Sequence, residues 1–259
     1  MTLLIAVLAA LCIWLFGLFW TYRKRFYIAT GRDQNYAIPT VKIAEFDPRF
    51  RVGPHGPTHD AEVAFIGGAE SVKAGVTDRE AWILSVLAKD ARMIFEFGTA
   101  TGKTAYLLAR NSPAAARVVT LTLAPLQRAD YRHEPGDRDV ARKVALEESA
   151  FSDFLYTGTP EEAKITQLYG DSKTFDHSPF VGRCNLIFVD GAHAYSYVMS
   201  DSTKAFEMLA PGGVILWHDY KKRSGPPRDV VRALDQIARE RKLVRLNATH
   251  LVAYRDGAA

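Results

Sequence analysis

The segment from Cys184 to Tyr220 constrains the fold more than any other part of the sequence. It reads as an apolar strand ending at Asp190, a short polar loop, an amphipathic helix and a second apolar strand from Val214 to Trp217. Two strands that flank a helix form a βαβ unit, in which the strands are parallel. Because open α/β sheets bind ligands at the carboxyl ends of their strands, Asp190 and the pair His218-Asp219 are expected at a functional edge.

Strand and helix patterns alternate along the rest of the chain. Helices are predicted over residues 78–88, 101–110, 140–155 and 229–242, and strands over 40–43, 92–97, 117–123 and 165–169. Two more strands, 243–246 and 250–255, are expected to form a hairpin about Asn247. This order predicts an α/β fold, with a doubly wound, mostly parallel, Rossmann-like sheet and a C-terminal antiparallel hairpin.

The N-terminus carries an unbroken apolar run from Leu3 to Trp20. As a helix this run is about 27 Å long, close to the ~30 Å thickness of the hydrocarbon core of a bilayer. The basic residues Arg23, Lys24 and Arg25 follow the run, whereas a cleavable signal peptide carries its charge before the run and a small-residue cleavage site after it. The pattern therefore favours an uncleaved transmembrane helix that holds the downstream domain in the cytoplasm.

We expect three parts: a transmembrane anchor over 1–22, a juxtamembrane linker over 23–60 and a folded domain over 61–259. The net charge of +4 comes from interleaved acidic and basic residues, which indicates a solvated surface and no nucleic-acid partner. Cys12 and Cys184 lie in apolar segments where no disulfide is expected, and this fits a reducing compartment. The expected location is the cytoplasmic (inner) membrane, crossed once.

A turn with two glycines joins the strand at 92–97 to the next helix. Glycine lets the backbone approach a ligand closely, and the N-terminus of the following helix favours anionic or polar groups. One interpretation is a phosphate-binding loop, which needs four residues between its glycines, but Gly98 and Gly102 are separated by three. The other interpretation uses Glu96, two residues before Gly98, which gives the pattern E-x-G-x-x-x-G.

Three further motifs accompany this turn: Gly170-Asp171-Ser172, VDGAHAY at 189–195 and PGGVILWHDY at 211–220. With them the chain resembles a bacterial family of class I S-adenosylmethionine-dependent methyltransferases over roughly residues 78–255. The resemblance implies that Asp171 and Ser172 lie beside the adenine of S-adenosylmethionine and that Asp190 faces the methyl donor and acceptor. The turn residues implied to line the cofactor pocket are Glu96, Gly98, Thr99 and Gly102.

The second strand departs from the family pattern at Thr122, where relatives typically carry an aspartate that binds both ribose hydroxyls. A threonine hydroxyl makes one neutral hydrogen bond where a carboxylate accepts two charge-assisted ones, a difference of roughly 1–3 kcal/mol. We therefore expect Thr122 to contact the cofactor more weakly, or Glu134 or another acid to take the place of the aspartate.

Methyl transfer to a hydroxyl needs a base that removes the proton of the acceptor. His193, three residues after Asp190, is the candidate base, and the alternative is that it only orders the loop before the next helix. Related sugar and small-molecule O-methyltransferases bind Mg²⁺ with acids at the ends of these strands. The resemblance thus implies a conditional Mg²⁺ site at Asp190 and Asp219, with His218 where a second carboxylate is often found.

The sequence predicts an S-adenosylmethionine-dependent O-methyltransferase that is anchored in a membrane. Its expected acceptor is a hydroxyl on a small molecule, a sugar or a lipid-linked compound, and the apolar N-terminal run is the reason for expecting a membrane-proximal acceptor. Two alternatives stay open at this point. One is a membrane-tethered cofactor-binding or scaffold module without catalysis, and the other is a P-loop-like nucleotide-binding protein.

Overall fold

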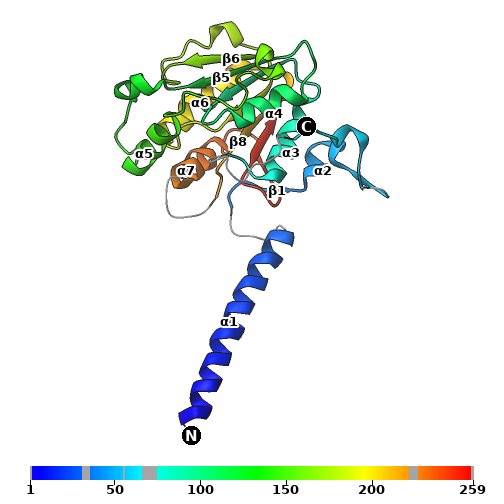
Figure 1. Ribbon diagram of the computed structural model, residues 1–259, viewed down its shortest axis with the longest axis vertical. Helices are drawn as coiled ribbons and strands as arrows, with labels where there is room; N and C mark the ends of the chain where they lie inside the picture. Colours follow the sequence, from blue (N-terminus) through cyan, green and yellow to red (C-terminus); the bar gives the residue numbers. More distant parts are fainter. Residues whose placement is uncertain (1, 31–35, 55, 66–74, 222–226, 258–259) are drawn as a thin grey trace.

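The computed structural model describes residues 2–30, 36–54, 56–65, 75–221 and 227–257. The first helix, α1 (Thr2–Thr30), extends away from the rest of the protein (Figure 1). Its segment Leu4–Arg23 has a mean hydropathy of 2.4, and none of it is buried. By length and composition, this helix can cross a membrane.

The domain that follows is built on an eight-stranded sheet with the order β1-β9-β10-β8-β7-β4-β5-β6. β10 runs antiparallel to both of its neighbours, and the other pairs are parallel. The doubly wound sheet and the C-terminal hairpin expected from the sequence are therefore confirmed. The strands are β1 (Thr40–Val41), β4 (Met93–Phe97), β5 (Arg117–Thr122), β6 (Ile165–Tyr169), β7 (Cys184–Val189), β8 (Leu209–Trp217), β9 (Val244–Leu246) and β10 (Val252–Arg255).

Helices cover both faces of the sheet. Alternate residues of a strand point to opposite faces, so that Ile94 of β4 packs in the core beneath α3 (Asp78–Ala88) and α4 (Lys103–Asn111). Phe95 packs in the opposite core, beneath α6 (Tyr195–Met208) and α7 (Pro227–Ile237). The remaining helices of the domain are the short α2 (Ile43–Phe46) and α5 (Asp139–Glu148).

The predicted helix at 78–88 is confirmed, and its start has a local cause. Thr77 and Glu80 form a capping box, in which each side chain accepts a hydrogen bond from the backbone amide of the other. The helix expected over 140–155 is wrong beyond Glu148, because Phe154 and Tyr156 turn into the core and pack against the start of α4. The helix expected over 229–242 ends at Ile237, and the chain continues in tight turns.

The chain just after α1 joins the sheet at its edge. β1 pairs with β9 in the register Thr40 to Arg245. Tyr36 precedes β1, and its ring lies 5.1 Å from the ring of Tyr220. Ile38, which lies between Tyr36 and β1 in the sequence, is only 1% exposed. Residues of the expected juxtamembrane linker thus contribute an edge strand and core side chains.

Candidate active site

The sheet reverses its strand order between β4 and β7, and a cleft lies at the carboxyl ends of these strands. β5 and β6 extend the sheet on one side of β4, whereas β7 and β8 extend it on the other. Doubly wound folds bind ligands in the crevice outside such a switch point. This first cleft has about 570 Å³ of empty space, which includes the part that is open to solvent. Its lining includes Gly98, Leu121, Thr122, Asp171, Ser172, Asp190 and Asp201.

Gly98 brings the end of β4 into direct contact with the end of β7. Its φ is +99°, and a Cβ at this position would lie 2.2 Å from the carbonyl oxygen of Asp190. The Asp190 amide also donates to the Phe97 carbonyl at 2.9 Å, which ties the two strand ends together. Because only glycine fits here, the floor of the cleft consists of bare backbone that a ligand can approach closely.

The side of the cleft next to β5 and β6 carries the residues expected beside the adenine and ribose. Asp171 accepts hydrogen bonds from the Tyr197 hydroxyl at 3.1 Å and from the Lys173 amide at 2.9 Å. Thr122 lines the cleft at the end of β5, as expected for a ribose contact. Glu134, considered as a substitute acid, bonds Lys173 Nζ at 2.6 Å and does not line the cleft.

Three of the predicted cofactor residues do not line the first cleft. Glu96 is 1% exposed and accepts a hydrogen bond from Thr120 Oγ1 at 2.6 Å, and burial raises the pKa of this carboxyl to about 8 despite that bond. Thr99 turns its hydroxyl toward Thr120, at 2.8 Å. Gly102 packs against Tyr156. These residues support the glycine turn from behind rather than face the first cleft.

A second cleft of about 710 Å³ adjoins the first one. The two clefts share Gly98, Ala100, Glu148 and Asp190 in their walls. The second cleft is otherwise more polar, and its lining adds Lys103, His193, His218, Asp219 and Lys221. The structure therefore brings together the predicted residues Asp190, His193, His218 and Asp219 beside a junction of two binding spaces.

His193 is held by a carboxylate on each side. Its Nε2 lies 2.7 Å from Asp219 Oδ2, and its Nδ1 lies 3.9 Å from Glu148 Oε2. Nδ1 has no hydrogen-bond partner among the residues that the structure describes. Burial works against a charge on this ring, but the hydrogen bond with Asp219 and the charge of Glu148 raise the pKa of His193. Asp219 has a φ of +60°, a strained conformation that is typical of functional turns.

Glu148 lines both clefts, with its side chain about one-third exposed. Burial raises the pKa of this carboxyl to about 7, although the charge of His193 opposes the shift. A carboxyl that titrates near neutral pH can accept or release a proton under physiological conditions. Glu148, His193 and Asp219 thus form a chain of proton-binding groups that leads inward from the junction of the clefts.

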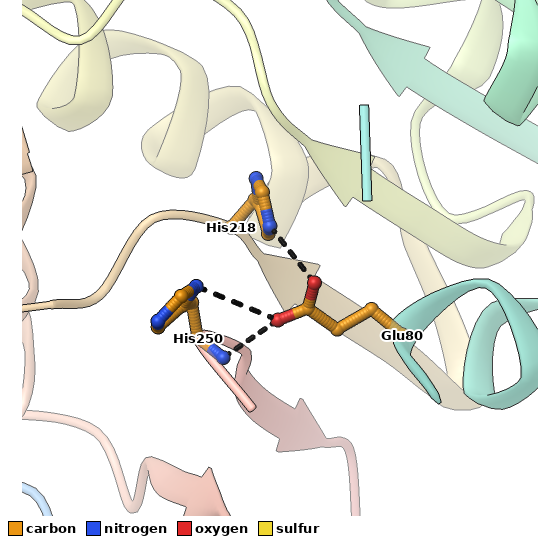
Figure 2. A group of neighbouring side chains, drawn as sticks. All are labelled: Glu80, His218 and His250. Carbon is orange, nitrogen blue, oxygen red and sulfur yellow. Dashed lines mark hydrogen bonds and ion pairs between the residues drawn. The ribbon is translucent and has the colours of Figure 1, made fainter. Parts of the chain in front are cut away.

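His218 forms a second chain, with Asp190 and Glu80. Its Nδ1 lies 3.1 Å from Asp190 Oδ1, and its Nε2 lies 3.3 Å from Glu80 Oε2. Figure 2 shows Glu80 between His218 and His250. Burial alone would lower the pKa of His218, but the charge of Asp190 and the bonds to both carboxylates raise it well above the usual value. The two neighbouring acids therefore favour the charged form of the His218 ring.

The donor set does not fit the Mg²⁺ site expected at Asp190, Asp219 and His218. Asp219 binds Lys221 Nζ at 2.6 Å through one oxygen and His193 through the other. Asp190 already accepts a hydrogen bond from His218. Mg²⁺ requires an octahedral shell of oxygen ligands, whereas these carboxylates face protein cations and His218 offers nitrogen.

Comparison with known proteins assigns this part of the chain. Residues 95–220 match a family model described as a methyltransferase domain. This segment is a methyltransferase domain. Its parallel strands, with the antiparallel hairpin inserted beside β8, make it a class I domain, the class that uses S-adenosylmethionine. No match was found among curated proteins.

Solved methyltransferases give weak structural similarity to the chain. An O-methyltransferase from Streptomyces achromogenes involved in tomaymycin synthesis, in complex with S-adenosylmethionine, is 18% identical with a TM-score of 0.46, over 71% of this chain and 82% of its own. An O-methyltransferase from Bacillus cereus in complex with S-adenosylhomocysteine is 17% identical with a TM-score of 0.47, over 73% and 86%. A putative O-methyltransferase from Klebsiella pneumoniae is 15% identical with a TM-score of 0.47, over 72% and 84%.

Sequence patterns missed several side chains that shape the site of the methyltransferase domain. Tyr131 lines the first cleft and stacks on Tyr197, with ring centroids 4.6 Å apart. Asp201, on α6, also lines it and is 1% exposed. Tyr131 lies in the polar segment before α5, and Glu148 is the last residue of α5; no sequence motif indicates where either side chain points. Asp201 carries a weak signal, since a carboxylate is unexpected on the buried face of an amphipathic helix.

Proposed function

We propose that the protein transfers a methyl group from S-adenosylmethionine to a hydroxyl oxygen, with the cofactor in the first cleft and the acceptor in the second. The observation that carries this proposal is the shared wall of the two clefts at Gly98, Glu148 and Asp190. A donor and an acceptor bound in adjoining spaces can meet in the in-line geometry that displacement at a methyl group requires.

The lining of the first cleft fits S-adenosylmethionine. The bare backbone at Gly98 leaves room for a close approach, and Thr122 and Asp171 offer oxygens to ribose and adenine. Tyr131 and Asp201 line the cleft, and the Tyr131 hydroxyl and Asp201 Oδ1 are buried beside it without a hydrogen-bond partner among the described residues. Buried polar atoms in proteins are normally paired, so these two atoms are suited to contact a polar ligand.

Bound S-adenosylmethionine would supply an electrophilic methyl group on a sulfonium. In the transfer the acceptor oxygen would take the methyl group as the sulfur–carbon bond breaks, and S-adenosylhomocysteine would be the leaving group. Glu148 lines both clefts at their junction, so its carboxylate would accept the proton of the acceptor hydroxyl. The unpartnered Nδ1 of His193 lies behind Glu148 and takes up this proton in turn when the ring is neutral, while Asp219 fixes the orientation of the His193 ring. Asp190, held by His218, places a negative charge beside the reacting groups.

We place the enzyme in the cytoplasmic membrane, with α1 as a single-pass anchor and the domain in the cytoplasm. The support is the exposed apolar surface of α1 and the basic residues Arg23, Lys24 and Arg25 that follow it. An enzyme held at a bilayer meets membrane-bound acceptors at high local concentration. A lipid-linked or sugar-like hydroxyl is therefore the acceptor class that we propose.

The test uses the full-length protein in a mild detergent. Calorimetry measures S-adenosylmethionine binding, and release of S-adenosylhomocysteine measures turnover over a panel of phenols, sugars and lipid-linked sugars. We expect saturable binding, and turnover with at least one acceptor that falls by about 10²–10⁴-fold in Glu148→Gln. The Glu134→Gln variant, changed at an exposed acid outside both clefts, is the control.

Two other results would contradict methyl transfer and support a different function. Saturable cofactor binding without turnover of any acceptor would support a tethered, non-catalytic binding module. ATP binding that depends on Lys103, with no binding of S-adenosylmethionine, would support a nucleotide-binding protein.

A further inference from the structure

Next to Asp190, three segments that are distant in the sequence bring two imidazoles and a carboxylate together. Glu80 comes from the first turn of α3, His218 follows β8, and His250 precedes β10. Figure 2 shows the carboxylate of Glu80 directed between the two rings. One ligand atom from each residue can be chosen so that all three lie within 4.8 Å of one another.

The distances are close to those of a metal centre. Ligand atoms in a tetrahedral zinc site with bonds of ~2.0–2.1 Å lie about 3.3 Å apart. His218 Nε2 is already 3.3 Å from Glu80 Oε2. His250 Nδ1 is 3.9 Å from the other carboxylate oxygen, Glu80 Oε1. Because one ligand atom from each residue lies within 4.8 Å of the other two, an ion bound to all three requires side-chain shifts of up to about 1.5 Å.

The surroundings of these residues also support metal binding. A histidine that binds a metal through one nitrogen usually donates its other N–H to a carboxylate, and His218 Nδ1 faces Asp190 in this way. The Glu80 carboxylate is held in place by the Thr77 amide at 2.9 Å and the His250 amide at 2.6 Å. A metal ion would enter from solvent on the side of His250, because the His250 side chain is 42% exposed whereas that of Glu80 is 1% exposed.

We propose that Glu80, His218 and His250 bind a divalent transition metal ion such as Zn²⁺. Two imidazole nitrogens and one carboxylate oxygen suit Zn²⁺, Co²⁺ or Ni²⁺ rather than Mg²⁺. The ion takes the place of the proton on His218 Nε2, which leaves to solvent, and water completes the coordination shell. The His218–Asp190 contact stays intact.

Metal binding at this place would connect three parts of the domain. The ion would link α3 and the β9–β10 hairpin to His218, the residue that follows β8. His218 would contact the ion through one nitrogen and Asp190 through the other. The ion would therefore change the charge next to Asp190, which lines both clefts, although the ion itself would not line the first cleft. The inference concerns binding alone and does not depend on the proposed methyl transfer.

The experiment is a calorimetric titration of ZnCl₂ into full-length protein that carries no polyhistidine tag and has been dialysed against a chelator. We expect about one equivalent of Zn²⁺ per chain, with an affinity reduced by about tenfold or more in His250→Ala and in Glu80→Gln. In parallel, Co²⁺ titration should give visible absorption bands in the wild type that are lost in the same variants. His59→Ala is the matched control, because His59 lies on the surface beside Glu62, at 3.1 Å, and is 89% exposed.

The zinc site can be tested even if one of the variants folds poorly. Circular dichroism of the metal-free proteins reports folding, and His250→Ala alters a half-exposed ring, so a folded form of this variant is expected. If Zn²⁺ does not bind the wild type, or if His250→Ala and His59→Ala reduce binding equally, the site does not exist.

Discussion

Gly98→Ala tests whether the close approach of β4 and β7 builds the cofactor cleft. An alanine Cβ would lie 2.2 Å from the Asp190 carbonyl oxygen and 2.7 Å from Gly191 Cα, and these are backbone atoms that cannot rotate away. The strand ends must therefore separate by about 1 Å to reach normal van der Waals distance. This movement strains the 2.9 Å hydrogen bond between the Asp190 amide and the Phe97 carbonyl.

The expected loss of stability has three parts. Left-handed backbone costs alanine roughly 1–2 kcal/mol, overpacking costs about 1–3 kcal/mol, and the weakened hydrogen bond costs about 0.5–1.5 kcal/mol. We expect Gly98→Ala to lower the free energy of unfolding by about 3–6 kcal/mol, a large share of the 5–15 kcal/mol typical of a domain. The matched control is Gly136→Ala. Gly136 has a φ of +95°, but an alanine Cβ there would meet no described atom within 4 Å, so only the backbone cost of about 1–2 kcal/mol applies.

The assay is equilibrium urea unfolding of the full-length protein in detergent, together with calorimetry of S-adenosylmethionine binding. Gly98→Ala should lose cofactor affinity by a larger factor than its control, since the residue lines both clefts. If the two variants have unfolding free energies within about 1 kcal/mol of each other, or if Gly98→Ala binds the cofactor like the wild type, the strand contact does not shape the site.

Four further predictions follow from the site and the anchor. His193→Gln should lower kcat by about 10²–10⁴-fold with unchanged cofactor affinity, and an equal loss of affinity would indicate a purely structural role. The wild-type rate should rise with pH through a pKa above the usual 6.5, because the bond to Asp219 and the charges of Glu148, Asp219 and Asp190 together outweigh burial. Glu96 has a pKa of about 8 when folded and 4.5 as a free side chain, so this group alone should lower the unfolding free energy by on the order of 3–5 kcal/mol as the pH rises from 4.5 to 8. In urea titrations Glu96→Gln should remove this contribution and leave the part that comes from Glu148 and Asp201. Chelator treatment followed by Mg²⁺ should not increase the rate of methyl transfer, because Asp190 and Asp219 are paired with protein cations; a Mg²⁺-dependent rate would contradict this. Deletion of residues 1–30 should move the protein from the membrane pellet to the supernatant after carbonate extraction, and retention in the pellet would show a second attachment.

The sequence predicted the elements whose signals are local. The capping box at Thr77 and Glu80 marks the start of α3, and the apolar strand patterns mark β6 and β7. The end of α5 was not predictable in this way, because the apolar spacing continues past Glu148 while packing against α4 draws Phe154 out of the helix. Tertiary contacts prevailed over periodicity there.

The candidate site was predictable in its position but not in its pairings. Residues at the carboxyl ends of parallel strands must lie at one edge, so the closeness of Asp190, His193 and Asp219 follows from the motifs. The pairing of His193 with Asp219 rather than Asp190 depends on side-chain directions after β8, which a spacing pattern does not contain. Glu148 ends α5, and only the folded chain shows that its side chain lines both clefts.

The pairing of β1 with β9 determines where a mechanical load on the anchor would act. Any pull on α1 reaches the domain first at Tyr36 and β1, which is held to β9 by the bonds from the Arg245 amide to the Pro39 carbonyl at 2.8 Å and from the Asn247 amide to the Val41 carbonyl at 2.9 Å. Tyr36 rests on Tyr220, the residue after Asp219. If α1 is anchored in a bilayer as proposed, a force on it would reach the turn that orients the His193 ring through the contact between Tyr36 and Tyr220.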